Sequence, residues 1–188
     1  MERDPVNSGT NLETSDPVRL HIGGVEPQPG WTILNVQPGP AVDLVGDCTD
    51  LGQFPEESVA EIYGSHVLEH LSYAGELDTA LQEFNRVLVP GGVVRISVPD
   101  FELLCRMFLH PALDIDKRFY IMRMIFGGQT DYTDFHKVGL TWEFLSNYLN
   151  AAGFSEIKRV DEFNIFQNDC SSIRYLGQLI SLNVEAVK

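Results

Sequence analysis

Basic residues are few in this sequence. Its 188 residues include 13 Lys and Arg against 27 Asp and Glu, which gives a net charge of −14. Such a charge repels both the phosphate backbone of nucleic acids and anionic lipid surfaces. We therefore expect no nucleic acid and no membrane among the partners, although one local basic pocket is compatible with this composition.

Cysteines and long apolar runs are scarce as well. The three cysteines, Cys48, Cys105 and Cys170, form no CxxC pair and are odd in number, which favours reduced thiols in a cytoplasmic protein. No apolar run is long enough to span a bilayer. The polar stretch 1–16 has no apolar signal-peptide region, so we expect a mobile tail followed by one domain over 17–188.

Short apolar runs alternate with turn residues and helical patterns along the rest of the chain. Seven runs are predicted as strands: 18–22, 31–36, 42–46, 59–64, 93–98, 154–160 and 179–187. Helices are predicted over 75–88, 101–109, 115–126 and 142–152. This order predicts an α/β domain with a largely parallel sheet.

The first three predicted strands are joined by connections too short to contain helices. About eight residues separate the first pair and about five the second, whereas a parallel crossover usually needs a dozen or more. One face of the sheet therefore needs another cover: the tail, a C-terminal insert or a second subunit. The Met-rich and aromatic segment 103–126 is predicted to cover this face first and to line an acceptor pocket second. A homodimer is a hypothesis on the same grounds.

Polar side chains follow the third and fourth predicted strands. Asp47 and Cys48 come directly after one strand, and Ser65 and His66 come after the next, where Ser65 is predicted as the N-cap of a helix. In an open α/β sheet, ligands bind at the carboxyl ends of the strands. The pattern therefore favours a binding site at this edge, although Asp47 and Ser65 as simple turn caps are the alternative.

The order of these elements resembles that of the class I S-adenosylmethionine-dependent methyltransferases. The resemblance rests on LHIGG (20–24), GDCTDLGQFPEESVAEIYGSHVLEH (46–70), EFNRVLVPGGVVRISVP (83–99), LSNYLNAAGF (145–154) and SLNVEAVK (181–188). The chain looks closest to a compact group of predicted methyltransferases, of the type 11-like kind, with GGQ (127–129) and FHK (135–137) elements. The resemblance implies a Rossmann-like seven-stranded sheet, mostly parallel with an antiparallel last strand, with helices reduced after strands one and two and a helical insert at 101–140.

The resemblance also implies a cofactor, S-adenosyl-L-methionine, with S-adenosyl-L-homocysteine as the product. The residues that it implies for binding are Gly23, Gly24, Gln37, Asp47, Cys48, Ser65 and His66. The two glycines would approach the methionine end of the cofactor. Asp47 would accept a hydrogen bond from the adenine amino group, beside the N–H of Cys48. Ser65 and His66 would lie near the methyl-bearing end.

Gln37 is a departure from the family pattern. The family usually has a carboxylate at the end of strand two that accepts from both ribose hydroxyls, and Gln37 stands at the predicted position. An amide loses the charge-assisted hydrogen bond, which is worth about 1–2 kcal/mol. We therefore expect weaker cofactor binding than in the family, or none, and tighter binding in Gln37→Asp.

Methyl transfer to a hydroxyl or amine also needs a group that takes up the acceptor's proton. His66 and His136 are the candidates for this base, and the polar residues around His136 favour it for the acceptor side. The alternative is that each histidine is simply satisfied by backbone hydrogen bonds. The acceptor is expected to be a small molecule or a glycan-type compound.

The string 66–70 also matches HxxEH, a zinc-hydrolase signature. In a helix its two histidines could share a metal. We discount this interpretation and expect no metal, because His66 directly follows a predicted strand. A further alternative is a non-catalytic binding or assembly module that keeps the methyltransferase fold.

Overall fold

The computed structural model describes residues 18–188, so the predicted mobile tail lies outside the described residues. Seven strands form one sheet in the order β3-β2-β1-β4-β5-β9-β6. Their bounds are β1 (Val18–Ile22), β2 (Thr32–Asn35), β3 (Leu44–Val45), β4 (Val59–Ser65), β5 (Leu88–Pro99), β6 (Ser155–Val160) and β9 (Ser181–Val187). Strand β9 is antiparallel to both neighbours, and the other neighbouring pairs are parallel. The predicted fold class is therefore confirmed.

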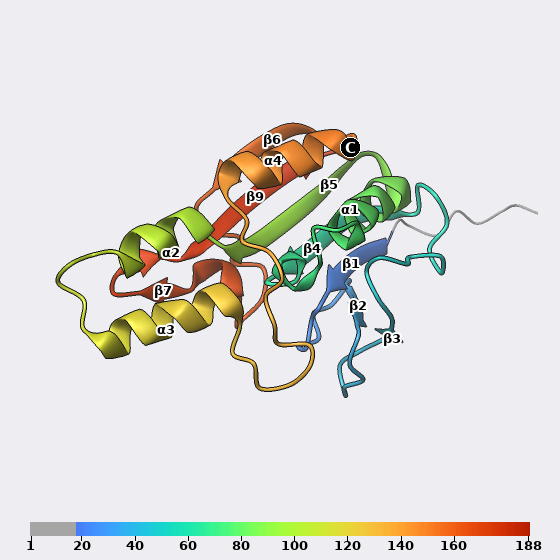
Figure 1. The fold of residues 1–188 in the computed structure, drawn as a ribbon. Coiled ribbons are helices and arrows are strands. Elements are labelled where there is room, and N and C mark those ends of the chain that lie inside the picture. The colour runs from blue at the N-terminus through green and yellow to red at the C-terminus, as the bar shows by residue number, and fades with distance from the viewer. Residues whose placement is uncertain (1–17) are drawn as a thin grey trace, which may run out of the picture.

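The helices lie in two groups (Figure 1). Helices α1 (Glu76–Val87) and α4 (Trp142–Ala151) lie over one face of the sheet, whereas α2 (Phe101–Phe108) and α3 (Ile115–Phe126) lie beyond one end of it. Within the described chain no helix stands between β1 and β4, as predicted, and η1 (Leu68–His70) is a single 3₁₀ turn. None of the described helices is both long and apolar enough to cross a bilayer.

One face of the sheet is buried beneath α1 and α4. Helix α1 has buried residues at helical spacing, among them Leu77, Leu81 and Phe84, because one apolar stripe faces the sheet. Helix α4 begins at its N-cap Thr141, whose hydroxyl accepts from the N–H of Phe144 at 3.2 Å. These helices and the strands form the main hydrophobic core.

The opposite face of the first strands is covered by a segment that the sequence analysis did not single out. Residues 161–173 contain the 3₁₀ turn η2 (Cys170–Ser172), and Phe163 and Phe166 pack against Trp31 and Tyr63. The imidazole of His21 stacks on Phe166 with ring centroids 3.9 Å apart. This part of the face is therefore covered by residues 161–173 of the same chain, and the helical insert predicted at 101–140 does not supply the cover.

The segment 103–126 does not cover that part of the face, so the prediction of its main role is wrong. Helices α2 and α3 pack on each other around Leu104 and Ile121. They also contact Ile180 and the hairpin formed by β7 (Arg174–Tyr175) and β8 (Gln178–Leu179). Because Leu179 belongs to this hairpin, the last strand begins at Ser181 rather than at the predicted residue 179.

Candidate functional site

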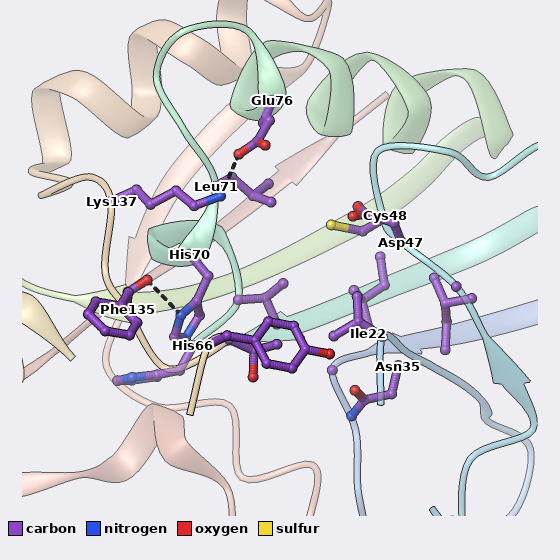
Figure 2. Close-up of a pocket in the computed structure, with 17 residues that line it drawn as sticks. Ile22, Asn35, Asp47, Cys48, His66, His70, Leu71, Glu76, Phe135 and Lys137 are labelled. Carbon is purple, nitrogen blue, oxygen red and sulfur yellow. Dashed lines mark hydrogen bonds and ion pairs between the residues drawn. The ribbon is translucent and has the colours of Figure 1, made fainter. Parts of the chain in front are cut away.

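A cavity of about 420 Å³ opens at the carboxyl edge of the sheet (Figure 2). Gly23 after β1, Asp47 and Cys48 after β3, and His66 after β4 line it together. The opposite wall comes from the loop between α3 and α4, through residues such as Phe135 and Lys137. The volume is within the range of small-molecule sites. Four of the seven residues predicted for the cofactor are therefore brought together here.

The glycine pair after β1 has two different roles. Gly23 has a φ of +76°, and a Cβ there would lie 2.6 Å from Cγ2 of Val67, so only glycine allows this tight turn beside the cavity. Its N–H donates to the carbonyl of Leu34 at 2.8 Å. Gly24 is buried behind the cavity, where a Cβ would meet the ring of His21 at 2.5 Å. Gly23 is thus a wall of the cavity, and Gly24 is a packing residue.

Asp47 presents one free carboxylate oxygen at the cavity. Its Oδ1 accepts from the N–H of Thr49 at 2.9 Å and from the Thr49 hydroxyl at 2.8 Å. Its Oδ2 accepts no hydrogen bond from residues 18–188. Burial, reinforced by the charge of Asp47, raises the pKa of the Cys48 thiol to about 12. The thiol is therefore neutral at physiological pH and unsuited to act as a nucleophile.

Strand β2 ends at Asn35, one residue earlier than predicted, and Asn35 rather than Gln37 lies at the cavity. Asn35 lines the cavity, its Oδ1 accepts from the N–H of Gln37 at 2.9 Å, and its Nδ2 donates to the carbonyl of Gly24 at 3.1 Å. Gln37 is exposed outside the lining, and its amide donates to the hydroxyl of Thr133 at 2.8 Å. The polar group at the end of strand two is therefore an amide, as expected, but it belongs to Asn35.

Ser65 is not a helix N-cap. It is the last residue of β4, paired with Ser97 of β5, and the turn η1 that follows has no side-chain cap. The Ser65 hydroxyl is buried without a hydrogen-bond partner among the described residues, and it lies outside the cavity lining. The prediction failed because the strand continues one residue further than its apolar run.

His66 turns the chain away from β4 in an uncommon backbone conformation. Its φ is +54°, a left-handed region that non-glycine residues rarely occupy, and its N–H donates to the carbonyl of Ser97 at 2.8 Å. The imidazole lies 3.0 Å from the Ser181 hydroxyl through Nε2. It lines the first cavity and also a second one of about 380 Å³. His66 therefore stands between two cavities.

Glu69 is a buried carboxylate surrounded by histidines. Its side chain is 2% exposed, and its Oε1 lies 3.3 Å from Nδ1 of His66 and 4.0 Å from Nε2 of His136. Burial alone would raise the pKa of Glu69, but the contact with His66 and the charges of His136 and His70 lower it overall. The carboxylate is therefore ionised at neutral pH in the interior beside the cavity.

The loop 127–137 carries His136 to this cluster. Gly127 begins the loop with a φ of +84°, and a Cβ there would collide with the carbonyl of Asp134 at 2.3 Å. The carbonyl of Glu69 accepts from the N–H of Lys137 at 2.7 Å and fixes the returning end of the loop. Burial lowers the pKa of His136, although the charge of Glu69 acts in the opposite direction. His136 also lines the second cavity, beside His66.

Sequence reasoning did not assign Asn35, Glu69 and His70 to the binding site. The strand-end position of Asn35 was obscured by the predicted length of the strand. Glu69 and His70 lie in the HxxEH string, which was considered as a metal motif and set aside. The acidic residue beside two histidines in this short string was the sequence signal that could have pointed to Glu69 and His70.

Comparisons with known proteins agree with this architecture. Residues 13–96 match a family model described as a methyltransferase domain. No curated protein sequence matches the chain. A S-adenosylmethionine-dependent methyltransferase from Archaeoglobus fulgidus is 16% identical, with a TM-score of 0.55 over 92% of this chain and 87% of that one. A second such enzyme, from Mesorhizobium loti, is also 16% identical, with a TM-score of 0.54 over 94% and 93% of the two chains.

A third similar structure contains bound ligands. It is the 1,6-didemethyltoxoflavin-N1-methyltransferase of Burkholderia thailandensis in complex with 1,6-didemethyltoxoflavin and S-adenosylhomocysteine. It is 15% identical, with a TM-score of 0.54 over 92% of this chain and 71% of that one. At these identities the structures show a shared fold. Together with the domain match, they confirm the resemblance to the class I S-adenosylmethionine-dependent methyltransferases.

Proposed function

We propose that this chain is a S-adenosylmethionine-dependent methyltransferase acting on a small-molecule or glycan-type acceptor. The observation that carries the proposal is the position of His66, which lines both cavities. A methyl donor in the first cavity and an acceptor in the second would meet at this side chain. Methyl transfer needs such an in-line approach of two molecules held in adjoining sites.

The first cavity fits the chemistry of the donor. Ile22, Leu34 and Leu71 give it apolar walls, the turn at Gly23 allows close backbone approach, and Asp47 offers its free oxygen for a hydrogen bond. The bound cofactor would supply an already activated methyl group on its sulfonium. In the cavity lining, Nζ of Lys137 donates a hydrogen bond to the carboxylate of Glu76 at 2.9 Å, which links the loop to α1 (Figure 2). This loop would help to exclude water.

The protein's chemical contribution would be the removal of a proton from the acceptor. His66 is the first candidate for this base, because its imidazole faces both cavities. His136 is the second candidate, on the side of the second cavity. That cavity is also lined by Tyr120 and Met124 of α3, so the predicted role of this segment in an acceptor pocket is kept in the proposal.

Binding of S-adenosylhomocysteine tests the proposal. At one hundred times its dissociation constant, the ligand is expected to stabilise the protein by about 2.7 kcal/mol. Asp47→Ala should weaken binding about tenfold, because it removes the acceptor for the adenine amino group. Asp50→Ala is the matched control, since Asp50 caps a neighbouring exposed turn outside the cavity lining. Calorimetry that detects no heat with millimolar ligand would favour the non-catalytic module instead.

A second test decides which of Asn35 and Gln37 lies at the ribose of the cofactor. Asn35→Asp is expected to tighten binding several-fold, because a carboxylate at the cavity wall can accept charge-assisted hydrogen bonds from the ribose hydroxyls, which outweighs the loss of the hydrogen bond that Nδ2 donates to the carbonyl of Gly24. Gln37→Asp should have a smaller effect, since that side chain bonds Thr133 outside the lining. Titration of the three proteins in parallel measures the order of affinities. The reverse order would restore Gln37 as the ribose-binding position.

A homodimer also stays a proposal, but its support has changed. The segment 161–173 covers part of the sheet face that first suggested it. Several apolar side chains of α3 are exposed, since Ile115 is 78% exposed, Phe119 57% and Phe126 54%. Exposed apolar side chains gathered on one helix favour association with another protein surface.

A further inference from the structure

We propose that Glu69, His70 and His136 bind a divalent transition-metal cation such as Zn²⁺ at the junction of the two cavities. The three residues each offer a ligand atom, and these atoms all lie within 4.8 Å of one another. Two of the residues come from the turn η1 and the third from the loop 127–137. The inference rests on these contacts and does not depend on methyl transfer.

The buried carboxylate of Glu69 is the first reason for the proposal. Both of its oxygens are buried, and neither has a hydrogen-bond donor with acceptable geometry among the described residues. Ionised groups in a protein interior are normally paired, hydrogen-bonded or bound to a metal. The chargeable groups within 4.0 Å of Oε1 in the described chain are imidazole nitrogens of His66 and His136, at 3.3 and 4.0 Å. A cation held between Glu69, His70 and His136 would compensate this buried negative charge.

The second reason is the orientation of His70. Its Nδ1 lies 3.2 Å from the carbonyl oxygen of Phe135. A carbonyl only accepts, so Nδ1 must carry the proton and Nε2 is left with the lone pair. This is the usual arrangement of a metal-binding histidine, in which a backbone carbonyl fixes the tautomer from behind. The ring also packs edge-on against that of His136, with centroids 4.8 Å apart.

The donor set determines the class of cation. Two imidazoles and one carboxylate suit zinc and similar transition metals, whereas magnesium and calcium prefer oxygen ligands alone. Around zinc, with bonds of roughly 2.0–2.2 Å, ligand atoms lie about 3.4 Å apart. The ligand atoms would therefore move by about an ångström as they close on the metal. Three protein ligands leave a fourth position open, which would face the cavities.

This site differs from the one that the HxxEH string suggests. That motif requires a helix in which the first and last histidines share the metal. Here the string contains a strand end and a single 3₁₀ turn, and Nε2 of His66 points to Ser181. The third ligand, His136, lies on a loop 66 residues further along the chain, so it is outside the string. The sequence expectation of no metal has not been tested, and this proposal departs from it.

Metal binding by untagged protein tests the proposal. Protein that has been stripped of metal with a chelator is dialysed against Zn²⁺ or Co²⁺. Bound metal is then measured by elemental mass spectrometry and, for Co²⁺, by visible absorption. One equivalent is expected. Glu69→Gln and His136→Asn should each weaken binding at least tenfold, consistent with the loss of one of three ligands. His110→Asn is the matched control, because this exposed histidine lies outside the site and should leave binding unchanged.

A third variant, His70→Asn, keeps the test decisive if one of the first two variants does not fold. If Glu69→Gln or His136→Asn fails to give the far-UV circular dichroism of the unmodified protein, His70→Asn decides, because its side chain is only partly buried. Failure of the unmodified protein to bind one equivalent would overturn the proposal. Stoichiometric metal that is retained in all folded variants of the three residues would overturn it equally, because the metal would then be bound elsewhere. Neither result depends on whether S-adenosylhomocysteine binds.

Discussion

Asp169→Ala is expected to destabilise the protein by about 3–5 kcal/mol. Asp169 is buried, and its Oδ1 accepts from the hydroxyl of Tyr63 and from the N–H of Ser171 at 2.8 Å. Its Oδ2 accepts from the N–H of Ile165 at 3.1 Å. Alanine would leave these three donors without their acceptor, and the Tyr63 hydroxyl lies within the aromatic cluster. Equilibrium unfolding in urea measures the change.

The pairing of Asp169 with Tyr63 can be isolated by a double-mutant cycle. Tyr63→Phe removes one donor and leaves the carboxylate with two others, so it should be destabilising by only about 1–2 kcal/mol. The double variant should then be less destabilised than the sum of the single variants. Asp161→Ala is the control, because this aspartate is exposed and its side chain accepts no hydrogen bond within the described chain. An Asp169→Ala variant as stable as this control would show that the segment 161–173 contributes little to the fold.

The segment 161–173, which Asp169 stabilises, is the part of the fold that could not be predicted from the sequence. The helix 115–126 was predicted with its observed bounds, and the seven-stranded sheet with an antiparallel last strand was implied by the family resemblance. Residues 161–173 have neither helical nor alternating periodicity, which are the primary local signals of structure. Their structure comes from contacts with distant strands, such as the bond between Asp169 and Tyr63, which are 106 residues apart. Such contacts leave no periodic pattern in the sequence.

The candidate site was predictable where it depends on strand ends. Gly23, Asp47 and His66 follow β1, β3 and β4, and parallel strands bring their carboxyl ends to one edge. The position of Asn35 was missed because the end of β2 was predicted one residue late, and the residue after that predicted end, Gln37, was taken as the binding position. The contact of Glu69 with His136 was missed for a different reason. It depends on the path of the loop 127–137, which is fixed by tertiary hydrogen bonds to the backbone of Glu69.

Acidification is expected to destabilise the protein through His21. Burial lowers the pKa of His21 from 6.5 to about 4, although the charge of Asp169 acts in the opposite direction. Below pH 6.5 the unfolded chain therefore binds a proton that the folded chain does not, so the free energy of unfolding falls with pH. The loss is expected to be about 2 kcal/mol between pH 7 and 5 and about 3 kcal/mol between pH 7 and 4. Above pH 6.5 the contribution is fully present.

His21→Phe separates this effect from the titration of carboxylates. A phenyl ring can keep the stacking on Phe166, and it removes a buried Nδ1 that has no hydrogen-bond partner in the described structure. The variant should therefore be about as stable as the unmodified protein at pH 7 and about 3 kcal/mol more stable at pH 4. Carboxylates such as Asp169, whose pKa is lowered on folding, destabilise both proteins alike in acid, so they cancel in the difference. His110→Phe at an exposed position should leave the pH dependence unchanged. Urea titrations of the unmodified protein and of His21→Phe, run in parallel at pH 7 and pH 4, measure this difference. If both proteins lost stability equally, the proton would be taken up elsewhere and His21 would not be the cause of the acid destabilisation.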